Sequence, residues 1–198
     1  MRIVESIDVI VAGSFPKSRH WRRACRQVRQ AIQCTDWPHG SGKFTINPIV
    51  DGNAVIPIKK PCIERLQTLG WETEALPPIK GKVLKTGDLD ALSQTQGGCI
   101  GFEWETGNIS SSHRAINKLL LTLRRGGIVA GFLVVPSTEL YKYLTQRVGN
   151  IRELRPYLDL WKAIPVRNGA FRIVVVEHDA TSVRVKRIPK SKAGRARK

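Results

Sequence analysis

Two short acidic stretches in the middle of the chain carry the residues best suited to chemistry. The first is Asp88-Leu89-Asp90 and the second is Glu103-Trp104-Glu105. Alternate side chains of a β-strand share a face, so Asp88 would lie with Asp90, and Glu103 with Glu105. If the two strands pair, three or four carboxylates crowd one spot, which raises their pKa values and costs stability unless a cation neutralises them. Hard oxygen ligands of this kind select Mg²⁺ or Mn²⁺ rather than Zn²⁺.

A different interpretation explains the same carboxylates without a metal. They could lie on two solvated edge strands and pair with nearby lysines, and spacing alone leaves both interpretations open. A zinc site is disfavoured, because the four cysteines are far apart and form no CxxC pair. Cys34 and His39 come nearest to zinc-ligand spacing, and we expect four reduced thiols.

The charge of the chain indicates a polyanionic partner. The 198 residues suit one domain, and 33 lysines and arginines against 16 acidic residues give a net charge of +17. This excess favours nucleic acid first and an anionic membrane surface second. The chain shows neither an apolar run long enough to cross a membrane nor a signal-peptide pattern at its start, so we expect a cytoplasmic, bacterial-type protein. We expect one domain over residues 1–187 and a mobile basic tail over 188–198.

The elements that must position the acidic residues alternate as in an α/β protein. Hydrophobic periodicity, caps and stop signals predict a mixed central sheet flanked by helices on both faces. Ser18, Thr138 and Asn150 are the expected helix caps. The predicted helices cover 18–34, 59–69 and 110–125; the predicted strands cover 83–92, 99–105 and 128–135, with a turn over 93–98 and a closing hairpin of 171–177 with 181–187.

The first predicted helix has an arginine-rich face. Its apolar positions, Trp21 and Val28 among them, recur at helical spacing, while arginines fill the other positions. A solvated surface and a DNA contact both account for these arginines, and spacing alone slightly favours the solvated surface. The five residues are Arg19, Arg22, Arg23, Arg26 and Arg29.

The order of these features resembles a known nuclease superfamily. An aspartate on one strand, Glu-x-Glu on the next and a helix after it are similar to the PD-(D/E)xK nucleases. More narrowly, the chain resembles the BglII/BstYI/BamHI branch of type II restriction endonucleases. The opening Met1–Glu5, the helix end Leu69-Gly70-Trp71-Glu72 and the apolar strand 128–135 add to the likeness, which is collinear over about residues 1–145. It implies a restriction-endonuclease-like fold.

The resemblance also implies roles for individual residues. Asp90 would be the first metal-binding aspartate, with Asp88 as the competing candidate, and Glu103 would be the second metal ligand. The main-chain carbonyl of Trp104 would complete the protein's share of the coordination. Glu105 occupies the position where most of the superfamily has lysine and where this branch has Glu or Gln.

The implied reaction is hydrolysis of phosphodiesters to 5′-phosphate ends. Mg²⁺ would be the cofactor, with Mn²⁺ able to substitute, and the number of metal ions stays open. Glu105 would orient or deprotonate the attacking water. Glu74 matches a fourth polar position of the active site, with Glu72 as its competitor.

Two further segments are candidate DNA contacts. The first directly follows the Glu-x-Glu strand and opens a helix, where N–H groups and short hydroxyls suit phosphates and base edges. Simple N-capping by one serine would explain one of these residues without DNA. The second segment, 137–150, is implied by the resemblance. The candidates are Asn108, Ser110, Ser111, Ser112 and His113 in the first segment, and Lys142 and Arg147 in the second.

Together these features predict a Mg²⁺-dependent, sequence-specific endonuclease that cuts double-stranded DNA as a homodimer. A restriction enzyme of this kind implies a cognate DNA methyltransferase in the host. Two alternatives are a structure-specific repair or junction nuclease, and a non-enzymatic basic nucleic-acid-binding protein whose acidic residues are structural.

Overall fold

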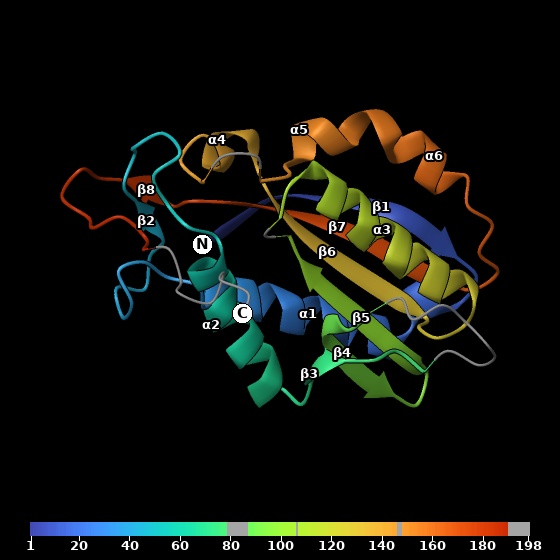
Figure 1. Ribbon diagram of the computed structural model, residues 1–198. Helices are drawn as coiled ribbons and strands as arrows, with labels where there is room; N and C mark the ends of the chain where they lie inside the picture. The colour runs from blue at the N-terminus through green and yellow to red at the C-terminus, as the bar shows by residue number, and fades with distance from the viewer. Residues whose placement is uncertain (79–86, 106, 146–147, 190–198) are drawn as a thin grey trace, which may run out of the picture.

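Six strands form one mixed sheet in the order β1-β7-β6-β5-β4-β3 (Figure 1). The computed structural model describes residues 1–78, 87–105, 107–145 and 148–189. β5 and β6 are parallel, as are β6 and β7, and the remaining neighbours are antiparallel. The strands are β1 (Arg2–Ala12), β3 (Glu72–Ala75), β4 (Leu89–Thr95), β5 (Gly98–Trp104), β6 (Ala130–Pro136) and β7 (Gly169–Glu177).

Helices cover both faces of this sheet, which confirms the predicted fold class (Figure 1). One face packs against α1 (Arg19–Gln33) and α2 (Ile56–Thr68). The other packs against α3 (Ile109–Arg124), α5 (Ile151–Leu154) and α6 (Leu158–Lys162). A short helix α4 (Thr138–Tyr141) follows β6, and two 3-10 turns, η1 (Phe15–Lys17) and η2 (Arg155–Tyr157), complete the helical elements of the described residues.

The central strands lie between two hydrophobic cores. Every residue of β6 is buried, as expected for an almost wholly apolar strand covered on both faces. On β5, Phe102 and Trp104 pack into the core beneath α1 and α2. Alternation along the strand then directs Glu103 to the opposite face, where α3 lies.

Most predicted helix boundaries agree with the structure. Ser18 caps α1 and accepts a hydrogen bond from the backbone N–H of Trp21 at 3.1 Å, and Asn150 caps α5. The prediction for α2 was wrong by three residues, because Pro57 occupies its first turn and Pro61 lies inside the helix. The predicted cap Thr138 was also wrong.

The cap of α4 is one residue earlier. The side chain of Ser137 accepts a hydrogen bond from the N–H of Leu140 at 3.0 Å. The strands flanking the predicted turn 93–98 reach Thr95 and begin again at Gly98, so the turn is only two residues long. Residues 83–86 of the predicted strand lie outside the described residues.

The predicted closing hairpin of 171–177 with 181–187 is wrong. β7 instead lies between β1 and β6, and β8 (Ala180–Thr181) pairs in parallel with β2 (Thr45–Ile46) in a separate two-stranded sheet. Asp179 fixes this change of direction, since its carboxylate accepts a hydrogen bond from the N–H of Phe44 at 2.7 Å. Ile188, the first residue of the predicted tail, is buried, and residues 190–198 lie outside the described residues.

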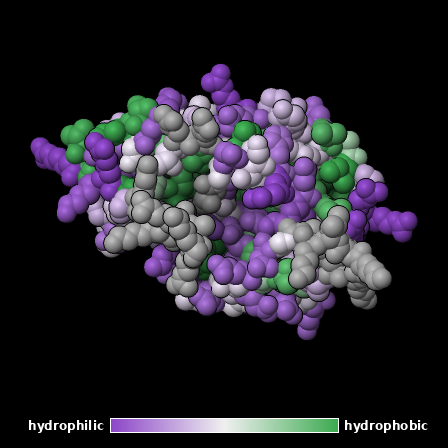
Figure 2. All heavy atoms as spheres, in the orientation of Figure 1, coloured by the Kyte–Doolittle hydropathy of each residue, from purple (hydrophilic) through white to green (hydrophobic). Residues whose placement is uncertain are grey.

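In Figure 2 the middle of the molecule, over α3, is mostly hydrophilic. Apolar residues gather at the left and right sides of the same view. The apolar residues over β2 and β8 include Val50 and Val183, and those over α6 include Leu160. Within the described parts of the chain, no helix combines the length and apolar character that a membrane span requires.

Candidate active site

The pairing of β4 with β5 brings the acidic residues together. Ala91 pairs with Phe102 at the end of the antiparallel ladder, which places Asp90 and Glu103 beside each other just beyond it. Both line a pocket of about 410 Å³ together with Glu105. The side chains predicted to share a site therefore face one cavity.

Asp90 is held on both carboxylate oxygens. Oδ2 accepts a hydrogen bond from the backbone N–H of Trp104 at 2.8 Å, and Oδ1 lies 2.7 Å from Nζ of Lys59 on α2. The N–H and C=O of one residue in a strand point to the same side, so the Trp104 carbonyl also faces β4. A carboxylate and a main-chain carbonyl thus lie on the same side of β5.

Glu103 is buried, with 8 % of its surface exposed, and forms an ion pair with Lys118 on α3. The pKa of Glu103 is raised to about 7, chiefly because the side chain is buried and also because the charge of Asp90 lies nearby, while Lys118 opposes both effects. Nζ of Lys118 also donates a hydrogen bond to the backbone carbonyl of Asp88 at 2.6 Å. Lys118 therefore ties α3 to the start of β4.

Glu105 follows the last residue of β5 and is also buried, with 4 % exposed. Its Oε1 accepts a hydrogen bond from the backbone N–H of Gly107. A Cβ on Gly107 would lie 2.7 Å from the side chain of Ser111, so a larger residue here would force the first turn of α3 away from Glu105.

Three basic residues line the pocket but were not predicted from the sequence as part of the site: Lys59, Arg114 and Lys118. Glu105 is acidic, and the lysines of the pocket come from two helices, Lys59 from α2 and Lys118 from α3. Ser111, Arg114 and Lys118 follow one another at helical spacing after the Glu-x-Glu strand, and this pattern could have identified two of the three. Lys59 has no such local signal, because it lies 31 residues before Asp90.

The geometry separates the competing acidic candidates. The side chain of Asp90 lines the pocket, whereas the described contact of Asp88 is made by its carbonyl. Glu74 lies on β3 between two residues paired with Ala91 and Leu89, which places it opposite Asp90. Its φ of 50° is left-handed, a strained conformation for a residue other than glycine, and it is not among the described lining residues.

Glu72, the competitor of Glu74, pairs with Leu92, two residues beyond Asp90 along β4, and is not among the described residues that line the pocket. Its Oε1 accepts a hydrogen bond from Nε2 of Gln94, near the far end of β4. Of the two glutamates on β3, Glu74 is therefore the one adjacent to the acidic cluster.

The residues that open α3 divide into surface and interior positions. Asn108, not a serine, caps the helix, and its side chain accepts a hydrogen bond from the N–H of Ser111 at 3.1 Å. Ser110 is exposed and Ser111 lines the pocket. Ser112 is fully buried, packed against Gly149, so its predicted place on a DNA-facing surface is wrong.

His113 and Lys142, two further predicted DNA contacts, are not among the described residues that line the pocket of the acidic cluster. His113 packs edge-on against Tyr157, with ring centroids 4.5 Å apart, and joins α3 to the helices that follow α5. Lys142 is exposed and pairs with Glu139 three residues earlier, with Nζ 2.7 Å from Oε2. Arg147 lies outside the described residues.

The oxygen donors of the pocket fit a hard divalent cation. Two carboxylates, from Asp90 and Glu103, and the Trp104 carbonyl converge there, and the raised pKa of Glu103 marks a site where an added positive charge is favourable. In the described residues no group of three His, Cys, Asp or Glu side chains is arranged to hold a metal ion. The ammonium groups of Lys59 and Lys118 contact the two carboxylates, and a cation would have to displace them.

Comparisons with known proteins agree with this arrangement. A family model described as restriction endonuclease BamHI matches residues 1–195. The type II restriction enzyme OkrAI of Oceanobacter kriegii is 44 % identical over 170 residues, which are 86 % of this chain and 87 % of that protein. The type II restriction enzyme BamHI of Bacillus amyloliquefaciens is 35 % identical over 189 residues, which are 92 % of this chain and 86 % of that protein.

A solved structure supports the same fold. The crystal structure of restriction endonuclease BglII complexed with a DNA 16-mer matches with a TM-score of 0.62 and 11 % identity, covering 90 % of this chain and 79 % of that one. At this identity the likeness concerns the fold alone. The family follows from the sequence matches, which span nearly the whole chain: it belongs to the BamHI family of type II restriction endonucleases.

Proposed function

We propose that the protein is a Mg²⁺-dependent endonuclease that cuts double-stranded DNA at specific sequences and leaves 5′-phosphate and 3′-hydroxyl ends. The observation that carries this proposal is the convergence of Asp90, Glu103 and Glu105 on one pocket bordered by three basic side chains. Membership in the BamHI family supports the same substrate and reaction.

Each residue of the pocket has a role in the proposed reaction. Asp90, Glu103 and the Trp104 carbonyl would hold the cation, and Mn²⁺ has the same preference for oxygen donors. When bound, the ion lowers the pKa of water and stabilises negative charge that develops on the phosphate. Glu105 orients or deprotonates the attacking water. Glu74, opposite Asp90, supports this site from β3.

The basic side chains of the pocket suit the scissile phosphate of DNA. Lys59, Arg114 and Lys118 place positive charge beside the position of the scissile phosphate, where it favours binding and the added charge of the transition state. The lysine charges also stabilise the acidic pair before a cation binds. The two carboxylates thus have positively charged partners both before and after a cation binds.

DNA contacts are proposed at two segments, the start of α3 and residues 137–150. Asn108, Ser110 and Ser111 open α3 beside Glu105, and N–H groups at a helix start suit phosphate oxygens. Lys142 and Arg147 are proposed for the second segment. Because one acidic cluster cuts one strand, we also propose a two-fold symmetric homodimer, and a cognate methyltransferase in the host.

A digest of plasmid DNA tests the proposed function. With Mg²⁺ we expect discrete fragments at fixed positions, and fragment ends that a ligase joins without prior phosphorylation. Mn²⁺ should support cutting, and a chelator should abolish it. A mobility shift without cutting under all metal conditions would contradict the proposed enzyme, and cuts at nicks or junctions only would contradict the proposed substrate.

A further inference from the structure

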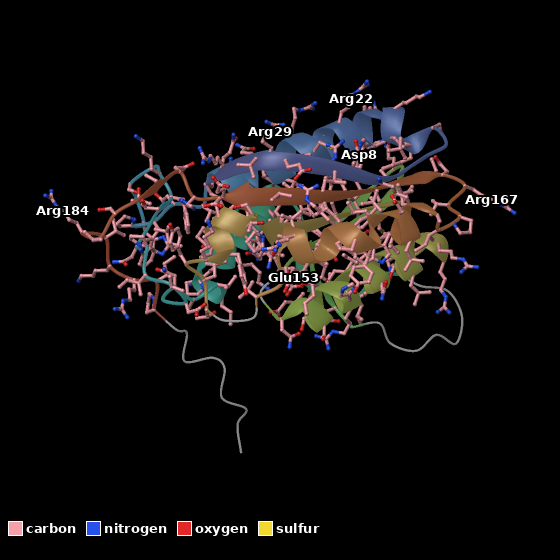
Figure 3. The ribbon with its side chains drawn as sticks, turned by 90° about the horizontal axis from the view of Figure 1, so that it is seen from above. Asp8, Arg22, Arg29, Glu153, Arg167 and Arg184 are labelled. Carbon is pink, nitrogen blue, oxygen red and sulfur yellow. The ribbon has the colours of Figure 1, made fainter. Side chains whose placement is uncertain are left out.

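The outer side of α1 carries five exposed arginines and no acidic residue. We call Arg19, Arg22, Arg23, Arg26 and Arg29 the α1 arginine face. Each arginine of this set has another three or four residues away, so their side chains lie next to one another along the helix. Arg22 and Arg29 stand out from the edge of the molecule in the view from above (Figure 3).

None of these five arginines forms an ion pair with another described residue. The nearest acidic side chains are already engaged. Asp8 binds Arg172 through both carboxylate oxygens at 2.6 and 2.9 Å, and Asp179 lies 2.9 Å from the N-terminal ammonium. Like charges at this spacing destabilise a helix, and a polyanion bound along it would relieve the repulsion.

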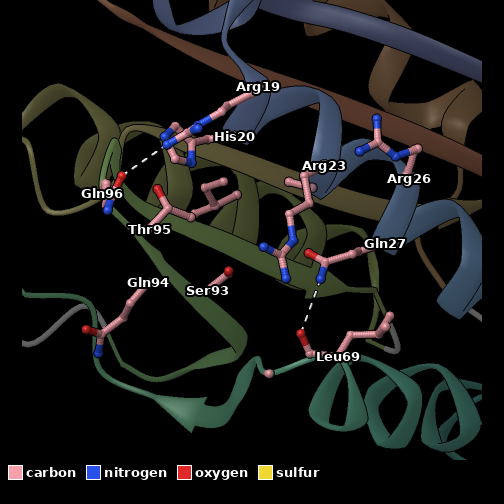
Figure 4. Close-up of a pocket in the computed structure, with 13 residues that line it drawn as sticks. Arg19, His20, Arg23, Arg26, Gln27, Leu69, Ser93, Gln94, Thr95 and Gln96 are labelled. Carbon is pink, nitrogen blue, oxygen red and sulfur yellow. Dashed lines mark hydrogen bonds between the residues drawn. The ribbon is translucent and has the colours of Figure 1, made fainter.

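Three adjoining hollows follow the α1 arginine face. The largest, about 600 Å³, lies between α1, the end of α2 and β4, and Arg23 and Gln27 point into it (Figure 4). Arg26 borders this hollow and a second one of about 170 Å³, and Arg29 borders the second and a third of about 560 Å³. Arginine side chains therefore line three open hollows that share lining residues along α1.

This surface is separate from the active-site pocket. The buried side of α1 packs on the face of the sheet that holds Phe102 and Trp104, whereas Glu103 faces α3. The largest hollow is lined by Ser93, Gln94 and Thr95 of β4, and Asp90 lines the active-site pocket, so the two are about 10 to 17 Å apart along the strand. A ligand on α1 would be a different segment from the one being cut.

We propose that the α1 arginine face binds the phosphate backbone of a second segment of duplex DNA, without reading its bases. The row from Arg19 to Arg29 extends about 15 Å, which spans several phosphates of one strand. One guanidinium group can donate two parallel hydrogen bonds to two oxygens of the same phosphate. A row of exposed guanidinium groups therefore suits a polymer of phosphates better than a single small anion. This proposal rests on the proposed function, which makes DNA the partner.

The composition of the face argues against a membrane surface. A helix that lies on a membrane inserts apolar side chains into it. The apolar residues of α1, such as Trp21, Val28 and Ile32, are buried in the core of this protein. Its outer side offers arginine and glutamine, which match a nucleic-acid backbone.

The test uses the triple variant Arg22→Gln, Arg26→Gln and Arg29→Gln, since glutamine keeps the helix propensity and removes the charge. The matched control is Arg124→Gln, Arg125→Gln and Arg167→Gln, three exposed arginines that lie outside α1 and do not line its three hollows. Fluorescence anisotropy follows binding to a 30-base-pair duplex that the enzyme does not cut, at several salt concentrations. The slope of log K against log salt should become shallower by about 2 to 3 units in the α1 variant, and by less than one unit in the control.

A capture experiment tests the second segment directly. One uncut duplex is immobilised, the enzyme is bound to it in chelator, and a second, fluorescent uncut duplex is added. The wild type and the control variant should retain the second duplex, and the α1 variant should not. Equal changes of salt slope in both variants, or no capture by the wild type, would overturn the proposal. Neither measurement depends on cleavage, so an absence of cutting would contradict only the proposed reaction.

Discussion

Glu103 destabilises the metal-free fold when it is ionised, although the proposed metal site needs its carboxylate. Its burial raises its pKa to about 7, well above the ordinary value of 4.5. Between pH 4.5 and pH 7, Glu103 is therefore mostly protonated in the folded protein and mostly ionised in the unfolded chain. The stability from this proton is present in full below pH 4.5 and is lost as the pH rises through 7. At pH 8 the metal-free protein therefore contains a poorly solvated carboxylate.

We predict that Glu103→Gln stabilises the metal-free protein at pH 8, because a neutral amide of the same shape replaces the buried charge. The shift in pKa corresponds to about 3 kcal/mol at most. Thermal unfolding in chelator should show the variant melting several degrees above the wild type at pH 8, with a difference that shrinks toward pH 5. A variant that melts below the wild type at pH 8 would mean that the ion pair with Lys118 outweighs the cost of burial.

Glu105 is predicted to act on the water rather than on the fold. Glu105→Ala should cut DNA at least about 100-fold more slowly, as expected for loss of a general base. Glu105→Gln separates two roles, since the amide oxygen can still orient water but cannot remove its proton. Single-turnover cleavage at saturating enzyme measures both variants. An alanine variant as fast as the wild type would leave Glu105 with only its structural hydrogen bond to Gly107.

The acidic residues were predictable from local patterns in the sequence, and Lys59 was not. Alternation along two neighbouring strands is a local pattern, and it placed Asp90 and Glu103 on one cavity once the strands paired. The contact of Lys59 with Asp90 depends on how α2 packs against β4, which no local pattern encodes. For Ser112 the local signal was misleading. Its hydroxyl favours a surface position, but its place on α3 buries the side chain completely.

At the scale of elements, the start of α3 links the cap of a helix to the edge of the active-site pocket. Asn108 is predicted to stabilise this end through its hydrogen bond to Ser111. Asn108→Ala should lower the free energy of unfolding by about 1 kcal/mol, and Asn108→Ser should restore most of it, because serine is an equally good cap. Denaturant unfolding measures both. If the serine variant is as unstable as the alanine variant, capping does not explain the role of Asn108.

The same two variants separate capping from DNA contact. If Asn108 also touches DNA, the serine variant should retain stability but bind DNA more weakly than the wild type. Anisotropy with the uncut duplex and with a duplex that spans a mapped cut site provides the comparison.

Elements whose partners are near in sequence were predicted well, and those with distant partners were not. α1 and the β4–β5 pair followed from caps, periodicity and a short turn. The closing hairpin failed because β7 pairs with β1, more than 150 residues earlier, and β8 pairs with β2. A short turn after Glu177 looked like a hairpin because His178 and Asp179 suit a turn, but the carboxylate of Asp179 bonds to Phe44 instead.

At the scale of the whole molecule, the 22.1 kDa chain has one acidic cluster among its described residues, and we propose that two copies cooperate to cut both strands. We predict that sedimentation of the protein with a duplex spanning a mapped cut site gives twice the chain mass, plus the mass of the DNA. Two-fold symmetry of the protein should match a palindromic site. A complex that contains one chain, and that nonetheless cuts both strands at once, would contradict the proposed dimer.

We propose that Asp90 and Glu103 form the metal-dependent centre that cuts DNA. The most direct measurement compares wild type, Asp90→Ala and Glu103→Ala for cleavage of a mapped DNA with Mg²⁺ and for binding of the same DNA in chelator. We predict no detectable cleavage by either variant, with binding as tight as in the wild type or tighter, because a carboxylate that repels phosphate has been removed. Cleavage at the wild-type rate by either variant would contradict the assignment of this site.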